Sequence, residues 1–299
     1  MRPLPLLALL VLTAPLAAQT PLHQQLQALA TESKGHLTIA CSLPGVALDC
    51  NLDPHGHPPM QSTFKFPLAM AVFHQIELGK LQLDQPVRFL KSDRYKTFSP
   101  LQDEFPEADV DVPVRKLLKV MAQQSDNIAS DLLLRTIGGP EALQQYLDSL
   151  GLAIHQHDSE HTLHADQTLQ YRDYAEPAAM VALLRLFADH SPLTPEHTTL
   201  LDTWLLESPS TPGRIKGLLP PGTPVAHKSG SSGVEGGMIP ATNDVALITL
   251  PPVAGRPARR LAIAIFLTDA HTTDEDACES ILARAAKAIY DTASAQPAP

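Results

Sequence analysis

The feature that most constrains the fold is a long helical middle between two ends that are rich in strands. Strand-like apolar runs occur at 36–43, 46–52, 223–232, 244–250 and 260–268. Between them, from about 62 to 205, apolar residues recur with helical spacing, and several helical segments end at glycine. Because the strands at the two ends need partners, we expect them to share one sheet in an α+β fold.

This distribution predicts two interleaved domains. Residues 21–56 and 207–299 would form one discontinuous domain, a mainly antiparallel sheet flanked by helices predicted at 21–33 and 273–290. Residues 57–206 would form an all-helical domain. Small ligands commonly bind at such a junction, so we expect the functional site there.

The first 18 residues have the pattern of a secretory signal peptide, with Arg2 before an apolar run from Leu4 to Leu12 and a small pair, Ala17 and Ala18, at the expected cleavage site. A membrane anchor is the alternative, but the apolar run is too short to span a bilayer. No cysteine follows the run, which argues against a lipid anchor. We therefore expect a periplasmic or secreted protein that is not held by the membrane after cleavage.

Charge and cysteine content narrow the possible partners. The formal net charge is −10, which argues against nucleic acid or an anionic membrane as the main partner, and we expect a monomer. Cys41 and Cys50 flank a turn at Pro44 and Gly45 and could pair in an oxidising compartment, but the strand register decides this and the question stays open. Cys278 is interpreted as an ordinary helix residue.

The first candidate motif is the segment QSTFKF, in which Ser62 precedes Lys65 by three residues. On a helix these positions share a face, so the ammonium group can lie beside the hydroxyl. Serine is a poor nucleophile until a base removes its proton, and a lysine among positive neighbours and apolar walls can serve as that base. The same spacing also arises by chance, so this pair alone identifies nothing.

The second candidate motif is QQSDNIASD, which supplies Ser125, Asp126 and Asn127. A second hydroxyl near Lys65 can relay a proton to a leaving nitrogen. The Asn127 amide can bind a substrate amide and hold the lysine. The alternative is a helix N-cap, where Ser and Asp are favoured.

The third candidate motif is AHKSGSSG, which places Lys228, Ser229 and Gly230 on a strand just before Ser231. An edge strand with small residues lets a substrate lie close and pair with the backbone. Lys228 would attract a carboxylate, and the N–H groups of Ser231 and Ser62 could form an oxyanion hole. A Gly- and Ser-rich turn is the alternative.

In this order the three segments match S-x-x-K, S-D-N and K-[ST]-G, and the chain resembles the class A serine β-lactamases. The segments QSTFK, GLLPPGTPVAHKSGSSG and ATND are similar to the PER-type extended-spectrum branch of that class. The resemblance covers nearly the whole chain beyond the signal peptide. It implies that family's fold, a small β-lactam substrate, an acyl-enzyme and no cofactor.

The family carries a glutamate on an omega-shaped loop, here about 155–175, and Glu160 stands where the resemblance places it. His164 occupies a position where most class A enzymes have Asn and the PER-type branch has His. Asp158 and Asp173 occupy the places of the usual Arg–Asp pair. Two acids cannot form that ion pair, so the loop must be held otherwise. The resemblance implies a wider loop that accepts oxyimino-cephalosporins as well as penicillins.

The resemblance assigns roles to the other candidates. Ser62 would attack the lactam, with Lys65 or a water held by Glu160 as the base, and Ser125 would protonate the ring nitrogen. Glu160 would then activate the deacylating water. Two further residues have two interpretations each. Arg214 either lies beside the substrate carboxylate or is a plain surface cation, and Phe98 either lines the site entrance or is a core residue.

Other functions remain open from the sequence. A D-Ala-D-Ala carboxypeptidase or a sensor that stays acylated would share the three motifs. The segment HQHDSEHTLHAD suggests a zinc site, but it departs from the H-x-H-x-D-H pattern of zinc β-lactamases because Asp158 and His161 are not adjacent. We therefore expect surface histidines and no metal.

Overall fold

The computed structural model describes residues 20–252 and 258–296. The predicted signal peptide, 1–18, lies outside the described residues. The described chain confirms the α+β class. Its main sheet has four antiparallel strands in the order β1-β8-β7-β6, with bounds β1 (His36–Ser42), β6 (Val225–Ser231), β7 (Ile239–Thr249) and β8 (Arg260–Ala270).

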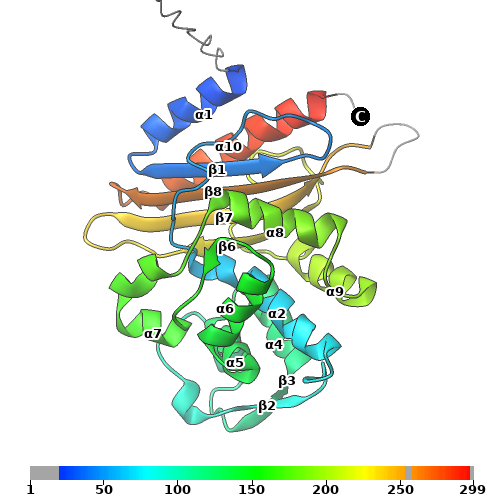
Figure 1. Cartoon of the computed structure of the whole chain (residues 1–299). Coiled ribbons are helices and arrows are strands. Elements are labelled where there is room, and N and C mark those ends of the chain that lie inside the picture. Colours follow the sequence, from blue (N-terminus) through cyan, green and yellow to red (C-terminus); the bar gives the residue numbers. More distant parts are fainter. Residues whose placement is uncertain (1–19, 253–257, 297–299) are drawn as a thin grey trace, which may run out of the picture.

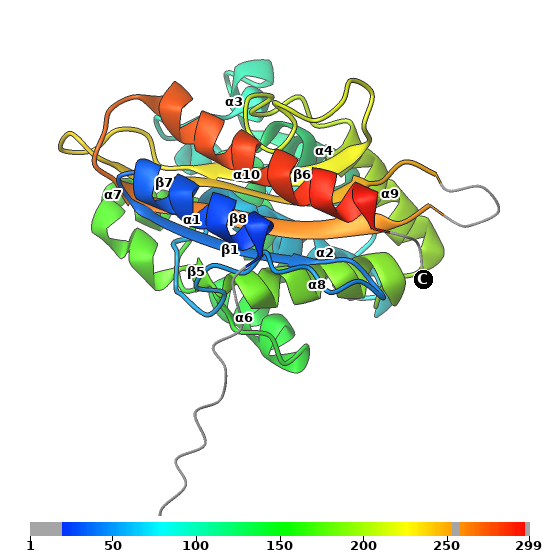
Figure 2. The same cartoon turned by 90° about the horizontal axis from the view of Figure 1, so that it is seen from above.

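Helices cover both faces of this sheet (Figure 1). Helices α1 (Pro21–Glu32) and α10 (Glu275–Ala295) pack side by side on one face, as Figure 2 shows from above. Helix α8 (Pro177–Asp189) packs on the other face against β8 and β1, and α9 (Pro195–Leu206) packs against β6. Edge strand β6 lies toward the helical part of the chain.

Strand β8 shows why the sheet needs cover on both sides. Its large residues Leu261, Ile263, Ile265 and Leu267 point into the core under α1 and α10. Its alternate residues Ala262, Ala264 and Phe266 join the second core, under α8 and the helical part. The period of two puts these sets on opposite faces. The two alanines let the helices of the second core pack closely against the strand.

The helical part lies on the opposite side of the sheet from α1 and α10 (Figure 1). Its helices are α2 (Lys65–Glu77), α3 (Pro100–Glu104), α4 (Val114–Gln124), α5 (Asn127–Ile137), α6 (Pro140–Ser149) and α7 (Glu160–Ala165), with 3₁₀ turns η1 (Gln61–Phe64), η2 (Lys91–Asp93) and η3 (Gln167–Arg172). The segment is not helical throughout. Two short antiparallel pairs interrupt it, β2 (Pro86–Phe89) with β3 (Val110–Pro113) and β4 (Ile154–His155) with β5 (Tyr174–Ala175).

The strand expected at 46–52 does not form. Only Leu52 pairs with β1, through an isolated bridge to Ile39, and the next outward N–H of β1, that of Cys41, donates to the Asn51 side chain and not to a strand backbone. The preceding residues turn away, and Cys50 forms a disulfide with Cys41. The question of whether Cys41 and Cys50 pair, which the sequence left open, is therefore answered by the disulfide.

Within residues 20–252 and 258–296, no helix combines the length and apolarity needed to cross a membrane. Cys278 is buried in α10 as a free thiol.

Candidate active site

Ser62 lies where the 3₁₀ turn η1 runs into α2, with Lys65 on the same side of the helix. Lys65 Nζ donates to Ser62 Oγ at 3.0 Å, and that hydroxyl lies 3.4 Å from Glu160 Oε1. Gln61, just before the serine, has a φ of 48°, in the left-handed region that a non-glycine residue adopts only under constraint. The serine hydroxyl is therefore held between an amine and a carboxylate.

Lys65 connects the first two motifs and the loop. Its side chain is fully buried, and its ammonium group donates to the Ser125 carbonyl at 3.0 Å and to Asn127 Oδ1. Its nitrogen lies 2.8 Å from Glu160 Oε1. A buried ammonium needs such polar partners to offset the loss of water. The structure thus brings together four of the predicted site residues, Ser62, Lys65, Asn127 and Glu160.

The second motif lies at the junction of α4 and α5. Ser125 ends α4 in a left-handed conformation, φ 62°, and Asp126 is the N-cap of α5, accepting from the Ala129 N–H. Asp126 is also held by Ser99 and the Leu101 N–H, and burial raises the pKa of its carboxyl group. The capping alternative therefore describes Asp126, while Ser125 and Asn127 are left to face the site.

The third motif lies on β6, which is an edge strand of the sheet, as expected. Lys228 Nζ donates to Ser125 Oγ at 2.9 Å. Burial, and then the charge of Lys65, hold the pKa of Lys228 well below its usual range. Gly230 passes so close to η1 that a Cβ would lie 2.6 Å from the Met60 carbonyl oxygen and 3.0 Å from the Ser62 nitrogen. Only glycine lets β6 approach the serine this closely.

Arg214 is a buried component of the site, so the surface-cation alternative is wrong. It is 5% exposed, and its Nη1 donates to the carbonyls of Gly230 at 2.8 Å and Asn243 at 2.9 Å. Its Nη2 donates to Ser231 Oγ at 2.6 Å, and its Nε pairs with Glu279 of α10 at 3.0 Å. The guanidinium thus lies beside the end of β6.

Two carboxylates, one half-buried and one buried, hold the loop that carries Glu160. Asp131 of α5 accepts from the N–H groups of Glu160 at 2.9 Å and His161 at 3.0 Å. Asp173 accepts from the N–H of His157 at 2.7 Å and from Gln156 Nε2 at 2.7 Å. Positions 158 and 173 do not form an Arg–Asp pair, as expected, and a backbone N–H group and the Gln156 amide bind Asp173 instead.

The same two carboxylates have strongly shifted acidities. Burial, and then the negative charge of Glu160, raise the pKa of Asp131 to about 7. Burial raises the pKa of Asp173 to about 7 as well, against the opposing effect of the His157 N–H bond. Asp158, the other acid at the positions of the usual Arg–Asp pair, makes an ion pair with Arg172 at 3.6 Å. Of Asp158 and Asp173, Asp158 therefore has a cationic partner.

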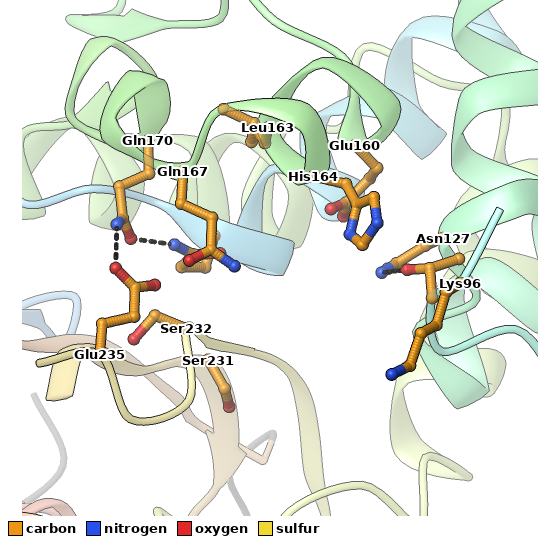
Figure 3. Close-up of a pocket in the computed structure, with 12 residues that line it drawn as sticks. Lys96, Asn127, Glu160, Leu163, His164, Gln167, Gln170, Ser231, Ser232 and Glu235 are labelled. Atoms are coloured by element: carbon orange, nitrogen blue, oxygen red, sulfur yellow. Dashed lines mark hydrogen bonds between the residues drawn. The ribbon is translucent and has the colours of Figure 1, made fainter.

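A polar cavity of about 260 Å³ separates the loop from the end of β6 (Figure 3). His164 and Glu160 line one side of it, and Ser231 and Glu235 line the other. Gln170 connects the loop to Glu235 through a 3.4 Å hydrogen bond, drawn in the same view. His164 therefore belongs to the wall of the site, as the sequence predicted.

A second hollow of about 420 Å³ contains the reactive hydroxyls. It is lined by Ser62, Ser125, Ser229 and Phe98 among others. The Phe98 side chain is 63% exposed, so it stands at the entrance and is not a core residue. Ser62 and Ser125 both line this hollow, which leaves room for a small cyclic substrate beside the nucleophile.

The histidines of the loop segment pack against aromatic rings. His155 contacts the ring of Tyr174 with centroids 4.6 Å apart, and His161 stacks on Tyr95 at 4.7 Å. Within the part of the chain that the structure describes, no group of three or more His, Cys, Asp or Glu is arranged to hold a metal ion.

Several residues of the site escaped the sequence interpretation. Asp131 holds the loop, Thr97 accepts from Asn127 Nδ2 at 2.7 Å, and Glu279 orients Arg214. Asp173 was noted in the sequence for its position, but not as an anchor of the loop. Asn243 Nδ2 donates to the Pro59 carbonyl just before η1, at 2.7 Å. The quoted segments QQSDNIASD and ATND contain Asp131 and Asn243, but neither pattern showed what these two side chains bind.

The convergence of two serines, two lysines and a loop carboxylate at the edge of a sheet is typical of serine hydrolases that work through an acyl-enzyme. The chain belongs to the β-lactamase enzyme family, whose model matches residues 21–293.

Similar proteins agree with this assignment. The chain is 35% identical to the extended-spectrum β-lactamase PER-1 of Pseudomonas aeruginosa over 92% of its own length and 88% of the relative's. It is also 35% identical to the β-lactamase VEB-1 of the same organism, over 73% of each chain. A solved β-lactamase from Chitinophaga pinensis superposes with a TM-score of 0.86 at 32% identity, covering 92% of this chain and all of that one. The predicted resemblance to class A enzymes is confirmed.

Proposed function

We propose that this protein is a class A serine β-lactamase that hydrolyses the lactam amide of penicillins and cephalosporins through an acyl-enzyme on Ser62. The observation that carries the proposal is the position of the Ser62 hydroxyl, 3.0 Å from Lys65 Nζ and 3.4 Å from Glu160 Oε1. Either group can serve as the base: Glu160 removes the proton through a water, or Lys65 removes it directly after its ammonium group has passed a proton to Glu160, 2.8 Å away. The family membership supports the same reaction.

Acylation begins when the substrate carboxylate docks near Lys228, Ser229 and Arg214. The lactam carbonyl oxygen enters the N–H pair of Ser62 and Ser231, which stabilises the negative charge of the tetrahedral intermediate. The Ser62 oxygen forms a bond to the carbonyl carbon and the C–N bond breaks. Ser125 passes a proton to the departing ring nitrogen, and its 2.9 Å bond to Lys228 Nζ supports this role.

Deacylation uses the carboxylate of Glu160. This group takes a proton from a water, the water oxygen attacks the ester carbonyl, and the bond to Ser62 breaks as the serine regains its proton. Asn127 and the loop anchors Asp131 and Asp173 position the participants. No step uses a metal or a cofactor.

The substrate range that we propose includes oxyimino-cephalosporins. The polar cavity between His164 and Glu235 extends the site beside the nucleophile and can receive a bulky acyl side chain. Phe98 at the entrance offers an apolar face to the substrate. PER-1, an extended-spectrum enzyme by its name, is a relative that this chain matches over 88% of the relative's length.

We also propose that the enzyme acts as an exported monomer in the periplasm or outside the cell. The signal pattern of residues 1–18 and the disulfide between Cys41 and Cys50 support an oxidising compartment. The discontinuous sheet domain, 21–56 with 207–299, and the largely helical domain, 57–206, are proposed as its two units. The site lies at their junction.

The test compares wild type with Ser62→Ala and Glu160→Gln on a chromogenic cephalosporin and a penicillin. We expect turnover by the wild type and essentially none by Ser62→Ala. Glu160→Gln should still react, but its acyl-enzyme should persist and appear in intact-protein mass spectra at the mass of protein plus substrate. A Glu160→Gln variant with wild-type turnover would indicate a carboxypeptidase-like enzyme. A wild type that stays acylated would indicate a sensor.

A further inference from the structure

Beneath the edge strand lies a buried ionisable pair that the proposed mechanism does not use. His227 of β6 and Asp244 of β7 have side chains with no exposed surface, and His227 Nδ1 lies 3.0 and 3.1 Å from the two Asp244 oxygens. The other ring nitrogen, Nε2, is buried without a hydrogen-bond partner in the described chain. Removing a carboxylate from water costs free energy of folding, so we expect Asp244 to perform a function at this buried position.

The pair is connected to both segments that bind the substrate carboxylate in the proposed function. His227 directly precedes Lys228, and Asp244 pairs with Ser229 across the two strands. The same carboxylate accepts the N–H of Ile215 at 3.4 Å, which is the residue after Arg214. One buried side chain therefore contacts the strand of the lysine and the segment of the arginine.

The surrounding charges give Asp244 a second effect. Lys228 is faced by Lys65 from α2 and by Arg214, which lower its pKa, and by Asp244 from β7 and Glu160 from the loop, which raise it. Burial alone already lowers the pKa of Lys228 strongly. Without Asp244, the loop glutamate, which also pairs with Lys65, would be the remaining acid among these groups.

We propose that Asp244, oriented by His227, is a positioning residue for the substrate-carboxylate site: it holds the strand of Lys228 through His227 and the segment of Arg214 through the Ile215 N–H. The inference rests on the proposed β-lactamase function. Asp244 touches no substrate atom. It acts through Lys228 and Arg214.

The central variant is Asp244→Asn, which keeps the size of the side chain and an acceptor for Ile215 but removes the charge. We expect KM for a penicillin to rise about tenfold with a smaller change in kcat, because a charged partner of the carboxylate is weakened. The alkaline limb of kcat/KM should move down by about one pH unit or more, because Lys228 would lose its proton sooner. Asp202→Asn is the matched control, since it removes one acid on α9 that pairs with Arg260.

A substrate without the carboxylate separates charge from structure. For the methyl ester of a cephalosporin, kcat/KM should be nearly the same in Asp244→Asn as in wild type, because the ester has no carboxylate for Lys228 to bind. Equal losses on acid and ester, with an unmoved alkaline limb, would reduce Asp244 to a structural role and overturn the proposal.

A second pair of variants keeps the test decisive if Asp244→Asn does not fold. His227→Gln retains an N–H donor toward Asp244 and should keep the wild-type alkaline limb, whereas His227→Leu should shift it downward. Identical profiles for these two variants would contradict the proposal. Inactive wild-type and Asp202→Asn proteins would instead refute the β-lactamase function itself, so the two failures are distinguishable.

Discussion

Replacing Asp131 by Asn should uncouple deacylation from acylation. The Asp131 carboxylate accepts from the N–H groups of Glu160 and His161 and from the Tyr95 hydroxyl at 3.1 Å. An asparagine of the same size has only one acceptor oxygen, and its amide group would face one of these N–H donors. The helical turn that carries Glu160 would therefore lose a charged hydrogen bond and gain an unfavourable contact.

The magnitude follows from the value of such bonds. A hydrogen bond to a charged group contributes about 1.5–3 kcal/mol, so the loop state that positions Glu160 should become about 10–100-fold less populated. Global stability should change less. The neutral amide avoids the burial cost that raises the pKa of Asp131 to about 7, and this offsets part of the loss.

The assay is stopped-flow acylation combined with quenched mass spectrometry on a penicillin. We expect kcat to fall about 10–100-fold, the acyl-enzyme to accumulate, and the acylation rate to stay within a few-fold of wild type. Asp93→Asn is the matched control, because Asp93 lines the same hollow behind the loop but pairs with Arg135 at 2.6 Å. If Asp131→Asn deacylated as fast as Asp93→Asn, the anchoring argument would be refuted.

Three further outcomes are expected. Changing Cys41 and Cys50 to Ser should lower the free energy of unfolding by about 2–3 kcal/mol for a bridge with a sequence separation of 9, with kcat retained; denaturant titration beside activity measures this. Gly230→Ala should lower kcat/KM by about 100-fold or more, because its Cβ would push against the Met60 carbonyl and displace the Ser62 N–H; a folded variant with wild-type kinetics would contradict this. The raised folded-state pKa of Asp173, about 7, favours its protonated form, so this residue contributes stability below about pH 4 that is lost as the pH rises to 7. Asp173→Asn should therefore flatten the decline of Tm between pH 4 and 7, and a decline as steep as in wild type would count against the assignment.

The sequence could predict the reactive centre because its chemistry is local. Ser62 and Lys65 share a helical face by spacing alone, and Lys228 and Gly230 share a strand. The spacing could not show that these two motifs meet in space. The order of the motifs matched a known family, and that resemblance implied one shared site. The α+β class followed from the placement of strands at both ends.

The loop anchors could not be predicted in the same way. Asp131 and Asp173 bind backbone N–H groups, which every residue except proline has, so no sequence pattern marks the partners. The buried state of Arg214 depends on α10 and Glu279, far along the chain. The strand expected at 46–52 had suitable residues and the open edge of β1 beside it, but a side chain, Asn51, takes the Cys41 N–H there and only Leu52 pairs through its backbone.

The pairing of β1 with β8 has a consequence for how the chain matures. His36 lies opposite Thr268, so the first strand to emerge during synthesis waits for one of the last before it acquires its regular neighbour. Pairing between such remote segments is slow, and it leaves apolar rows uncovered until the end of synthesis. A product that stops short of residue 260 would lack β8, one of the two central strands of the sheet. Such a product would leave β1 without its regular partner and would be degraded by proteases.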